Sequence, residues 1–114
     1  RDDVRVVGTV SDLELAGLYA HTDALFFLSA YEGFGLPVVE AARFGIPMIL
    51  SDGGSLAEIA PPGSCTVPCA MSVEDGASKA AAYLRDYIEQ DRSEYLARYT
   101  WLDAAKVIFP EAYQ

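Results

Sequence analysis

Basic residues are scarce in this chain. Its 114 residues include 8 Lys and Arg against 17 Asp and Glu, so the formal net charge is -9. Binding to nucleic acid and to anionic lipid depends on clustered Lys and Arg, and neither partner is expected. No apolar run approaches the about 20 residues that a transmembrane helix requires. The opening residues Arg1-Asp2-Asp3 do not resemble a signal peptide, which favours a cytoplasmic protein without a transmembrane segment.

Cysteine and histidine are also rare: Cys65, Cys69 and His21 are the only such residues. A zinc site needs more ligands than these can supply at their spacing. Metal ligands and metal cofactors are therefore not predicted. Two reduced thiols are favoured over a disulfide, and His21 is interpreted as a helix-end residue and not as a catalyst.

What the chain does contain is an apolar, alternating pattern. Hydrophobic residues make up 52%, which is typical of a folded domain. Strands and helices alternate, and this favours an α/β fold with a parallel sheet and helices on both faces. Strands are predicted at residues 4–7, 24–28, 46–50 and 65–67, and helices at 11–21, 37–44, 55–60, from 72 onward and at 102–109. A strand almost at the first residue suggests a portion of something longer.

Several details support these boundaries. Ser11 with Glu14, and Ser55 with Glu58, have the spacing of a capping box at a helix start. Pro37 suits the first turn of a helix, where its missing N–H is not needed. The continuous apolar run at 24–28 predicts a strand covered on both faces. The later helix is expected to pack through a stripe of apolar residues: Ala77, Ala80, Ala81, Leu84 and Ile88.

Residues 31–40 carry the strongest functional signal. The segment contains two glutamates with seven residues between them, two glycines and a proline. It lies between a predicted strand and a helix start, where unpaired backbone N–H groups can hold an anion. The loops at 8–10, 29–35 and 51–55 all leave the carboxyl ends of strands, so they should converge on one ligand crevice.

Glu32 and Glu40, with Gly-Phe-Gly-Leu-Pro between them, resemble the E-x7-E signature of retaining GT-B glycosyltransferases of group 1. The likeness extends over nearly the whole chain, from residues 8–12 through 41–47 and 51–55 to Thr100-Trp101. The resemblance implies a Rossmann-like GT-B C-terminal domain that is partial and carries a helical tail. It implies one domain over residues 1–114 that binds the nucleotide-sugar donor, without the N-terminal acceptor domain.

The resemblance also assigns roles to residues. Glu32 would lie beside the transferred sugar as the catalytic residue, positioning it without acting as a covalent nucleophile. Glu40 would hold the ribose hydroxyls, and Val10 would offer backbone contacts to the base. The sugar and diphosphate would meet the backbone amides around Gly33, Phe34, Gly35 and Leu36. The expected donor is a UDP-, GDP- or ADP-sugar, and no metal or cofactor is implied.

One feature departs from the family pattern. Members carry an Arg and a Lys upstream of the signature to neutralise the diphosphate, whereas Arg1 and Arg5 are the only basic residues before Arg43. We therefore expect the isolated chain to be inactive and to self-associate through surface meant for the acceptor domain. The alternative is a non-catalytic module that binds a nucleotide sugar or phosphate. A dinucleotide oxidoreductase is disfavoured because Val38 stands where the third glycine of its fingerprint belongs.

Overall fold

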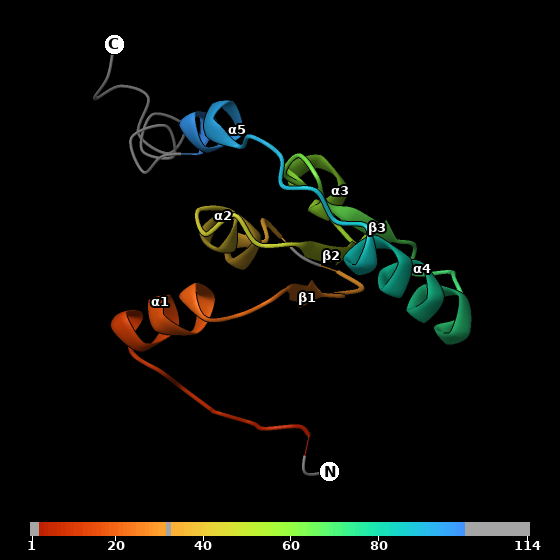
Figure 1. Cartoon of the computed structure of the whole chain (residues 1–114), viewed down its shortest axis with the longest axis horizontal. Helices are drawn as coiled ribbons and strands as arrows, with labels where there is room; N and C mark the ends of the chain where they lie inside the picture. Colours follow the sequence, from red (N-terminus) through yellow and green to blue (C-terminus); the bar gives the residue numbers. More distant parts are fainter. Residues whose placement is uncertain (1–2, 32, 100–114) are drawn as a thin grey trace.

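The structure is a computed structural model and describes residues 3–31 and 33–99. Helices and strands alternate along the chain (Figure 1). Their order is α1 (Asp12–Ala20), β1 (Leu25–Phe27), α2 (Leu36–Ala42), β2 (Met48–Ser51), α3 (Leu56–Ile59), β3 (Cys65–Val67), α4 (Val73–Arg85) and α5 (Ser93–Arg98). The three strands form one parallel sheet in the order β1-β2-β3. The predicted α/β, Rossmann-like class is confirmed.

Strand β2 lies in the middle of the sheet, and all of its residues are buried. Its side chains alternate between two cores because successive strand residues point to opposite faces. Met48 and Leu50 enter the larger core, to which α2, α3 and α5 also contribute buried side chains. Ile49 enters the smaller core with Cys65 of β3 and Ala80 of α4. Helices therefore cover both faces of the sheet, as predicted.

Strand β1 is at the edge of this sheet and is covered less completely than its sequence predicts. Phe26 is 53% exposed and Leu28 is 56% exposed. Phe26 pairs with Ile49, which in turn pairs with Cys65, so all three side chains lie on the face that α4 covers. Helix α4 packs on β3, and Phe26 lies two strands away. The prediction that both faces of residues 24–28 are covered is wrong for this reason.

Residues 4–7 do not form the predicted strand. They run as an extended trace that stands apart from the sheet (Figure 1), and Val4, Val6 and Val7 are exposed. An apolar extended segment becomes a strand only when a neighbour accepts its backbone hydrogen bonds. Within residues 3–31 and 33–99 the segment has no such neighbour. The sheet of the described chain consequently begins at β1.

The local signals at helix ends were more reliable. The Ser11 hydroxyl accepts the Glu14 N–H at 3.1 Å, and the Glu14 carboxylate accepts the Ser11 N–H at 3.3 Å. This confirms the first capping box. His21 caps the carboxyl end of α1, and its Nδ1 donates to the Gly17 carbonyl at 2.8 Å. Pro37 lies in the first turn of α2. Gly45 follows α2 with a φ of +68°, the left-handed conformation that glycine often adopts just after a helix.

Helix α4 begins at Ser72 as expected but packs through a different face. Its buried residues are Gly76 and Ala80, whereas Ile88 beyond its end is exposed. Of the predicted stripe, Ala80 is confirmed as buried, but the prediction is wrong for the other members, which are exposed: Ala77, Ala81, Leu84 and Ile88. Tyr83 accounts for the rotation, because its hydroxyl donates to the Gly63 carbonyl and accepts the Met48 N–H at 3.1 Å. These bonds fix the helix over β2 and β3.

The predicted helix at 102–109 and Trp101 lie outside the described residues. Of the helices that the structure describes, none is both long and apolar enough to cross a membrane. Cys65 is buried and Cys69 is exposed, and both are free thiols. Across residues 3–31 and 33–99, no three or more His, Cys, Asp or Glu side chains are grouped as metal ligands.

Candidate functional site

Two of the three predicted loops meet beyond the carboxyl ends of β1 and β2. The Ser51 hydroxyl donates to the carbonyl of Ser29, and the Ser55 hydroxyl donates to the carbonyl of Gly33 at 2.7 Å. Gly53 lies directly against the backbone of Ser29 and Ala30. The loops at 29–35 and 51–55 are thus held together, as the fold predicts.

These contacts correct one sequence prediction. Ser55 precedes α3 but makes no capping hydrogen bond with its side chain. Its hydroxyl is directed to the Gly33 carbonyl of the neighbouring loop. The Glu58 N–H, which a capping box would bring to this hydroxyl, bonds the Ser55 carbonyl instead, at 3.0 Å. The second capping box is therefore wrong, and Ser55 helps to shape the loop before α2.

The loop before α2 presents free backbone amides. Gly35 adopts the left-handed conformation with a φ of 83° and makes no side-chain cap. The Val38 N–H returns to the Gly35 carbonyl at 3.0 Å, and Pro37 has no N–H. The N–H groups of Gly33, Phe34, Gly35 and Leu36 make no hydrogen bond within the described part of the chain. Gly33, Phe34 and Leu36 are exposed, whereas Gly35 is buried, so the amides of the three exposed residues are the ones that a ligand could reach.

Glu40 lies one turn further along α2 and is partly buried. Its Oε2 accepts a hydrogen bond from the Tyr19 hydroxyl at 3.2 Å. Burial raises the pKa of Tyr19 to about 12, and the negative charge and hydrogen bond of Glu40 add to this rise. Tyr19 therefore keeps its proton and remains a donor to Glu40 throughout the physiological range.

The contact between Tyr19 and Glu40 was not predicted from the sequence. Tyr19 and Glu40 are separated by 21 positions, so no local spacing reveals the pair. One signal was available, because a buried tyrosine hydroxyl usually finds a polar partner. The sequence did not identify which partner it would be.

Val10 occupies a different region from the two joined loops. It lines a hollow of about 590 Å³ formed by residues 5–10 and the outer side of α1. In the described ranges, no hydrogen bond connects residues 8–10 with either loop. The structure thus brings together Gly33, Phe34, Gly35 and Leu36, with Glu40 on the following helix, but not Val10. Glu32 lies outside the described residues.

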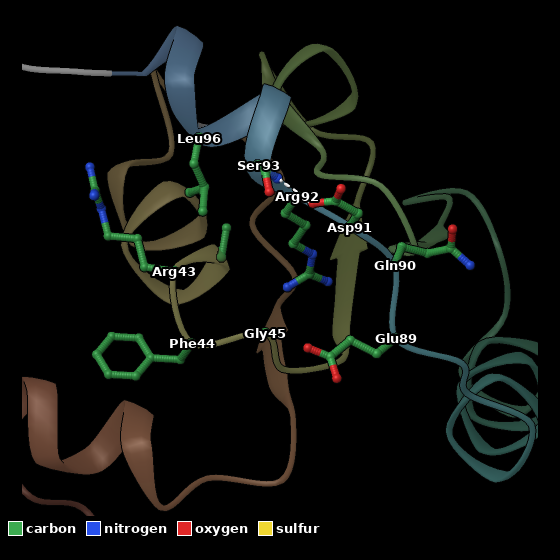
Figure 2. A pocket seen from close by; sticks show the side chains of 10 residues that line it. Arg43, Phe44, Gly45, Glu89, Gln90, Asp91, Arg92, Ser93 and Leu96 are labelled. Atoms are coloured by element: carbon green, nitrogen blue, oxygen red, sulfur yellow. Dashed lines mark hydrogen bonds between the residues drawn. The ribbon is translucent and has the colours of Figure 1, made fainter.

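A second hollow, of about 310 Å³, lies at the other end of α2 (Figure 2). It is lined by residues 42–45 and by the segment that precedes and begins α5. The Arg92 side chain enters it from that segment and is only 5% exposed. Its Nε donates to the Pro62 carbonyl at 3.1 Å and its Nη1 donates to the Ile46 carbonyl at 2.9 Å. Sequence reasoning missed Arg92, which ties the approach to α5 onto the sheet.

Alkaline pH should destabilise the fold through buried tyrosines. Burial raises the pKa of Tyr95 to about 12, and its hydroxyl donates to the Ile59 carbonyl. The folded-state pKa values of Tyr19 and Tyr95 exceed the ordinary tyrosine value of 10.0. The contribution of the two protonated hydroxyls to the free energy of unfolding is therefore complete below pH 10. It is lost as pH rises toward the folded values.

Urea denaturation at a series of alkaline pH values tests this expectation. The free energy of unfolding should fall across that window, and the fall should be smaller for Tyr95→Phe. A Tyr31→Phe variant is the control, because Tyr31 is exposed. Identical pH profiles for Tyr95→Phe and the unmodified chain would contradict the assignment.

The chain is similar to known glycosyltransferases. The family described as "Glycosyl transferases group 1" matches residues 1–100. The chain is 34% identical over 112 residues to the GDP-mannose:cellobiosyl-diphosphopolyprenol alpha-mannosyltransferase of Komagataeibacter xylinus. This alignment covers 91% of the chain and 28% of that protein. It is 35% identical over 105 residues to the serotype-specific mannosyltransferase WbdA of Escherichia coli, covering 87% of this chain and 12% of that protein.

A glycogen synthase of Mycobacterium tuberculosis is 41% identical over 78 residues, covering 68% of this chain and 18% of that protein. The chain therefore spans between 12% and 28% of the length of these relatives. The match to the family extends over most of the chain and includes both joined loops and α2. By this match, the chain belongs to the group 1 family of glycosyltransferases.

Proposed function

We propose that this chain is the donor-binding part of a retaining glycosyltransferase, which moves a sugar from a nucleoside-diphosphate sugar to an acceptor. Glu40 binds the ribose hydroxyls, and the amides at residues 33–36 meet the sugar and diphosphate. Val10 contacts the base through its backbone. The complete protein is cytoplasmic and needs no metal. Its N-terminal domain binds the acceptor, and the isolated chain is inactive.

The observation that carries this proposal is the combination of free loop amides and a partly buried carboxylate beside them in the chain. The amides of residues 33–36 make no hydrogen bond in the described ranges, and Glu40 Oε2 is held by Tyr19. Backbone N–H groups suit the oxygens of a diphosphate. An ionised carboxylate only accepts hydrogen bonds, so it suits the donor hydroxyls of a ribose.

Repulsion between negative charges explains why the carboxylate and the loop amides bind different parts of the donor. Two like unit charges 4 Å apart repel by about 4 kcal/mol at an effective dielectric constant of about 20. Glu40 therefore contacts the ribose and stays away from phosphate. Its bonds to hydroxyl groups are charge-assisted and about twice as strong as neutral ones.

For the reaction, we assign Glu32 the role of positioning the transferred sugar. A front-face route, in which the leaving phosphate assists attack by the acceptor, needs stabilisation of diphosphate charge more than a protein nucleophile. It leaves the anomeric configuration unchanged. Nuclear magnetic resonance of the product made by the complete protein tests this assignment, and a product of inverted configuration would contradict it.

The relatives suggest which donor to test first. One of them is named for GDP-mannose and another is a mannosyltransferase, so a GDP-sugar is the first choice. UDP- and ADP-sugars follow, since a glycogen synthase is also among the relatives.

Calorimetric titration of the complete protein with GDP, UDP and ADP sugars tests the donor site. We expect one donor to bind and Glu40→Ala to weaken that binding at least tenfold, or about 1.4 kcal/mol, because the charge-assisted bonds to the ribose are lost. Glu58→Ala is the matched control, because Glu58 is an exposed helical glutamate on α3. Binding of none of the donors would refute the proposal. Binding without transfer to any acceptor would favour a non-catalytic module.

Self-association of the isolated chain is a further expectation. Tyr31, Phe34 and Leu36 are exposed in the loop before α2, and Phe26 and Leu28 are exposed at β1. Large apolar side chains left exposed in this way favour association, and the acceptor domain would cover some of them. Light scattering of the chain should show a mass that increases with concentration. A strict monomer at high concentration would contradict this expectation.

A further inference from the structure

We propose that Tyr19 is a positioning residue, which fixes the Glu40 carboxylate so that it can recognise the ribose of the donor. The inference rests on the function proposed above and extends it to α1, to which no ligand role has been assigned. The observation that carries it is the hydrogen bond from the Tyr19 hydroxyl to Glu40 Oε2, at 3.2 Å.

The two residues approach each other from neighbouring helices. Tyr19 lies in the last turn of α1 and Glu40 lies in the middle of α2. The Tyr19 hydroxyl reaches Glu40 from α1 and binds Oε2. The loop at residues 33–36 lies at the start of α2 instead, so Tyr19 supports the carboxylate without belonging to that loop.

The tyrosine is itself held rigidly. It is 9% exposed and belongs to the larger core together with Ala41 and Ala42 of α2. Its ring packs on Phe44, with ring centroids 5.5 Å apart and an angle of 35° between the planes. The hydroxyl is consequently a fixed point, because the ring that carries it is held in the larger core and against Phe44.

Glu40 depends on this fixed point. In the described part of the chain its side chain makes no other hydrogen bond and no ion pair with Lys or Arg. A glutamate side chain has several rotatable bonds, and immobilising such a side chain on binding costs about 0.5–1.5 kcal/mol. The bond to Tyr19 orders the carboxylate before the ligand arrives. Oε2 then holds the Tyr19 hydroxyl, and Oε1 is the oxygen that remains available to the ribose hydroxyls.

Replacing Tyr19 by phenylalanine isolates this effect, because it removes the hydroxyl and keeps the ring. The complete protein should be titrated with whichever of GDP, UDP or ADP binds most tightly, and with its 2′-deoxy counterpart. We expect Tyr19→Phe to weaken binding of the ribonucleotide about fivefold, which corresponds to an ordering cost of about 1 kcal/mol. Binding of the 2′-deoxynucleotide should change much less. The preference for ribose over deoxyribose should therefore decrease.

Two further variants complete the test. Tyr87→Phe is the matched control: the Tyr87 hydroxyl also makes one hydrogen bond, to the Gly45 carbonyl at 3.3 Å, and it should leave the ribose preference unchanged. Glu40→Gln should weaken ribonucleotide binding by itself, and adding Tyr19→Phe to it should cause little additional loss. This non-additivity is the result expected if Tyr19 acts through Glu40.

The outcomes separate the inference from the function on which it rests. Equal weakening of both nucleotides by Tyr19→Phe would indicate a purely structural role and overturn the inference alone. Additive losses in the double variant would do the same. If Glu40→Gln had no effect on any nucleotide, the ribose-binding role of Glu40 would be wrong and the inference would fall with it.

Discussion

Gly53→Ala is expected to destabilise the chain by about 3 kcal/mol or more, because the site has no room for a methyl group. A Cβ at Gly53 would lie 2.6 Å from the carbonyl carbon and oxygen of Ala30 and even closer to the Ser29 oxygen. These are backbone atoms, so no side-chain rotation relieves the clash. The loops at 29–35 and 51–55 would have to separate. Donor binding by the complete protein should be lost together with stability.

The matched control for this variant is Gly17→Ala. Gly17 lies within α1, and a Cβ there meets nothing within 4 Å. Alanine in a helix interior is favoured over glycine by about 0.5–1 kcal/mol, so this variant should be more stable than the unmodified chain. Urea denaturation followed by circular dichroism measures both changes. A Gly53→Ala chain as stable as the unmodified one would show that the two loops are not packed as described.

Arg92→Ala is expected to cost about 3 kcal/mol of unfolding free energy. The guanidinium is almost fully buried and donates to the carbonyls of Pro62 and Ile46. Its removal leaves a cavity and deprives the buried Ile46 carbonyl of its side-chain donor. Arg92 Nη2 has no hydrogen-bond partner among residues 3–31 and 33–99, which limits the stabilisation that this arginine provides. Arg92→Met fills most of the side-chain volume but donates no hydrogen bond, so it should lower the unfolding free energy by about half as much as Arg92→Ala.

Arg98→Ala provides the control, because Arg98 lies at the exposed end of the same helix α5. It should change the stability by less than about 0.5 kcal/mol. Denaturant titration of the three variants under the same conditions ranks them. If Arg92→Ala proved as harmless as Arg98→Ala, the role of Arg92 in fastening α5 to the sheet would be disproved.

The fold could be predicted where the determinants are local. The capping box of Ser11 and Glu14 involves residues within one turn and was confirmed. The same Ser-x-x-Glu spacing at Ser55 did not give a capping box, because the Glu58 N–H bonds the Ser55 carbonyl, while the Ser55 hydroxyl donates to the Gly33 carbonyl 22 positions away. The packing face of α4 was also wrong, because it depends on the bonds of Tyr83 to Gly63 and Met48. Contacts between distant segments decided both cases.

The candidate site shows the same division. The convergence of residues 29–35 and 51–55 followed from parallel topology, since the connections leave the same edge of the sheet, and it was confirmed. The ligand roles of Glu40, Gly33, Phe34, Gly35, Leu36 and Val10 remain predictions, as does that of Glu32. The contact of Tyr19 with Glu40 could not be deduced, because it depends on how two helices are rotated against each other.

The position of β2 has a consequence for how the chain folds. Its neighbours β1 and β3 are both parallel to it, so neither pair can be closed by a tight hairpin, and each requires a crossover through a helix. The middle strand thus acquires its partners only after α2 and α3 have been brought into place. Such long-range closure slows folding and exposes unpaired strand surface to other molecules meanwhile. Chaperone assistance during synthesis should therefore matter most for the stretch that runs from β1 to β3.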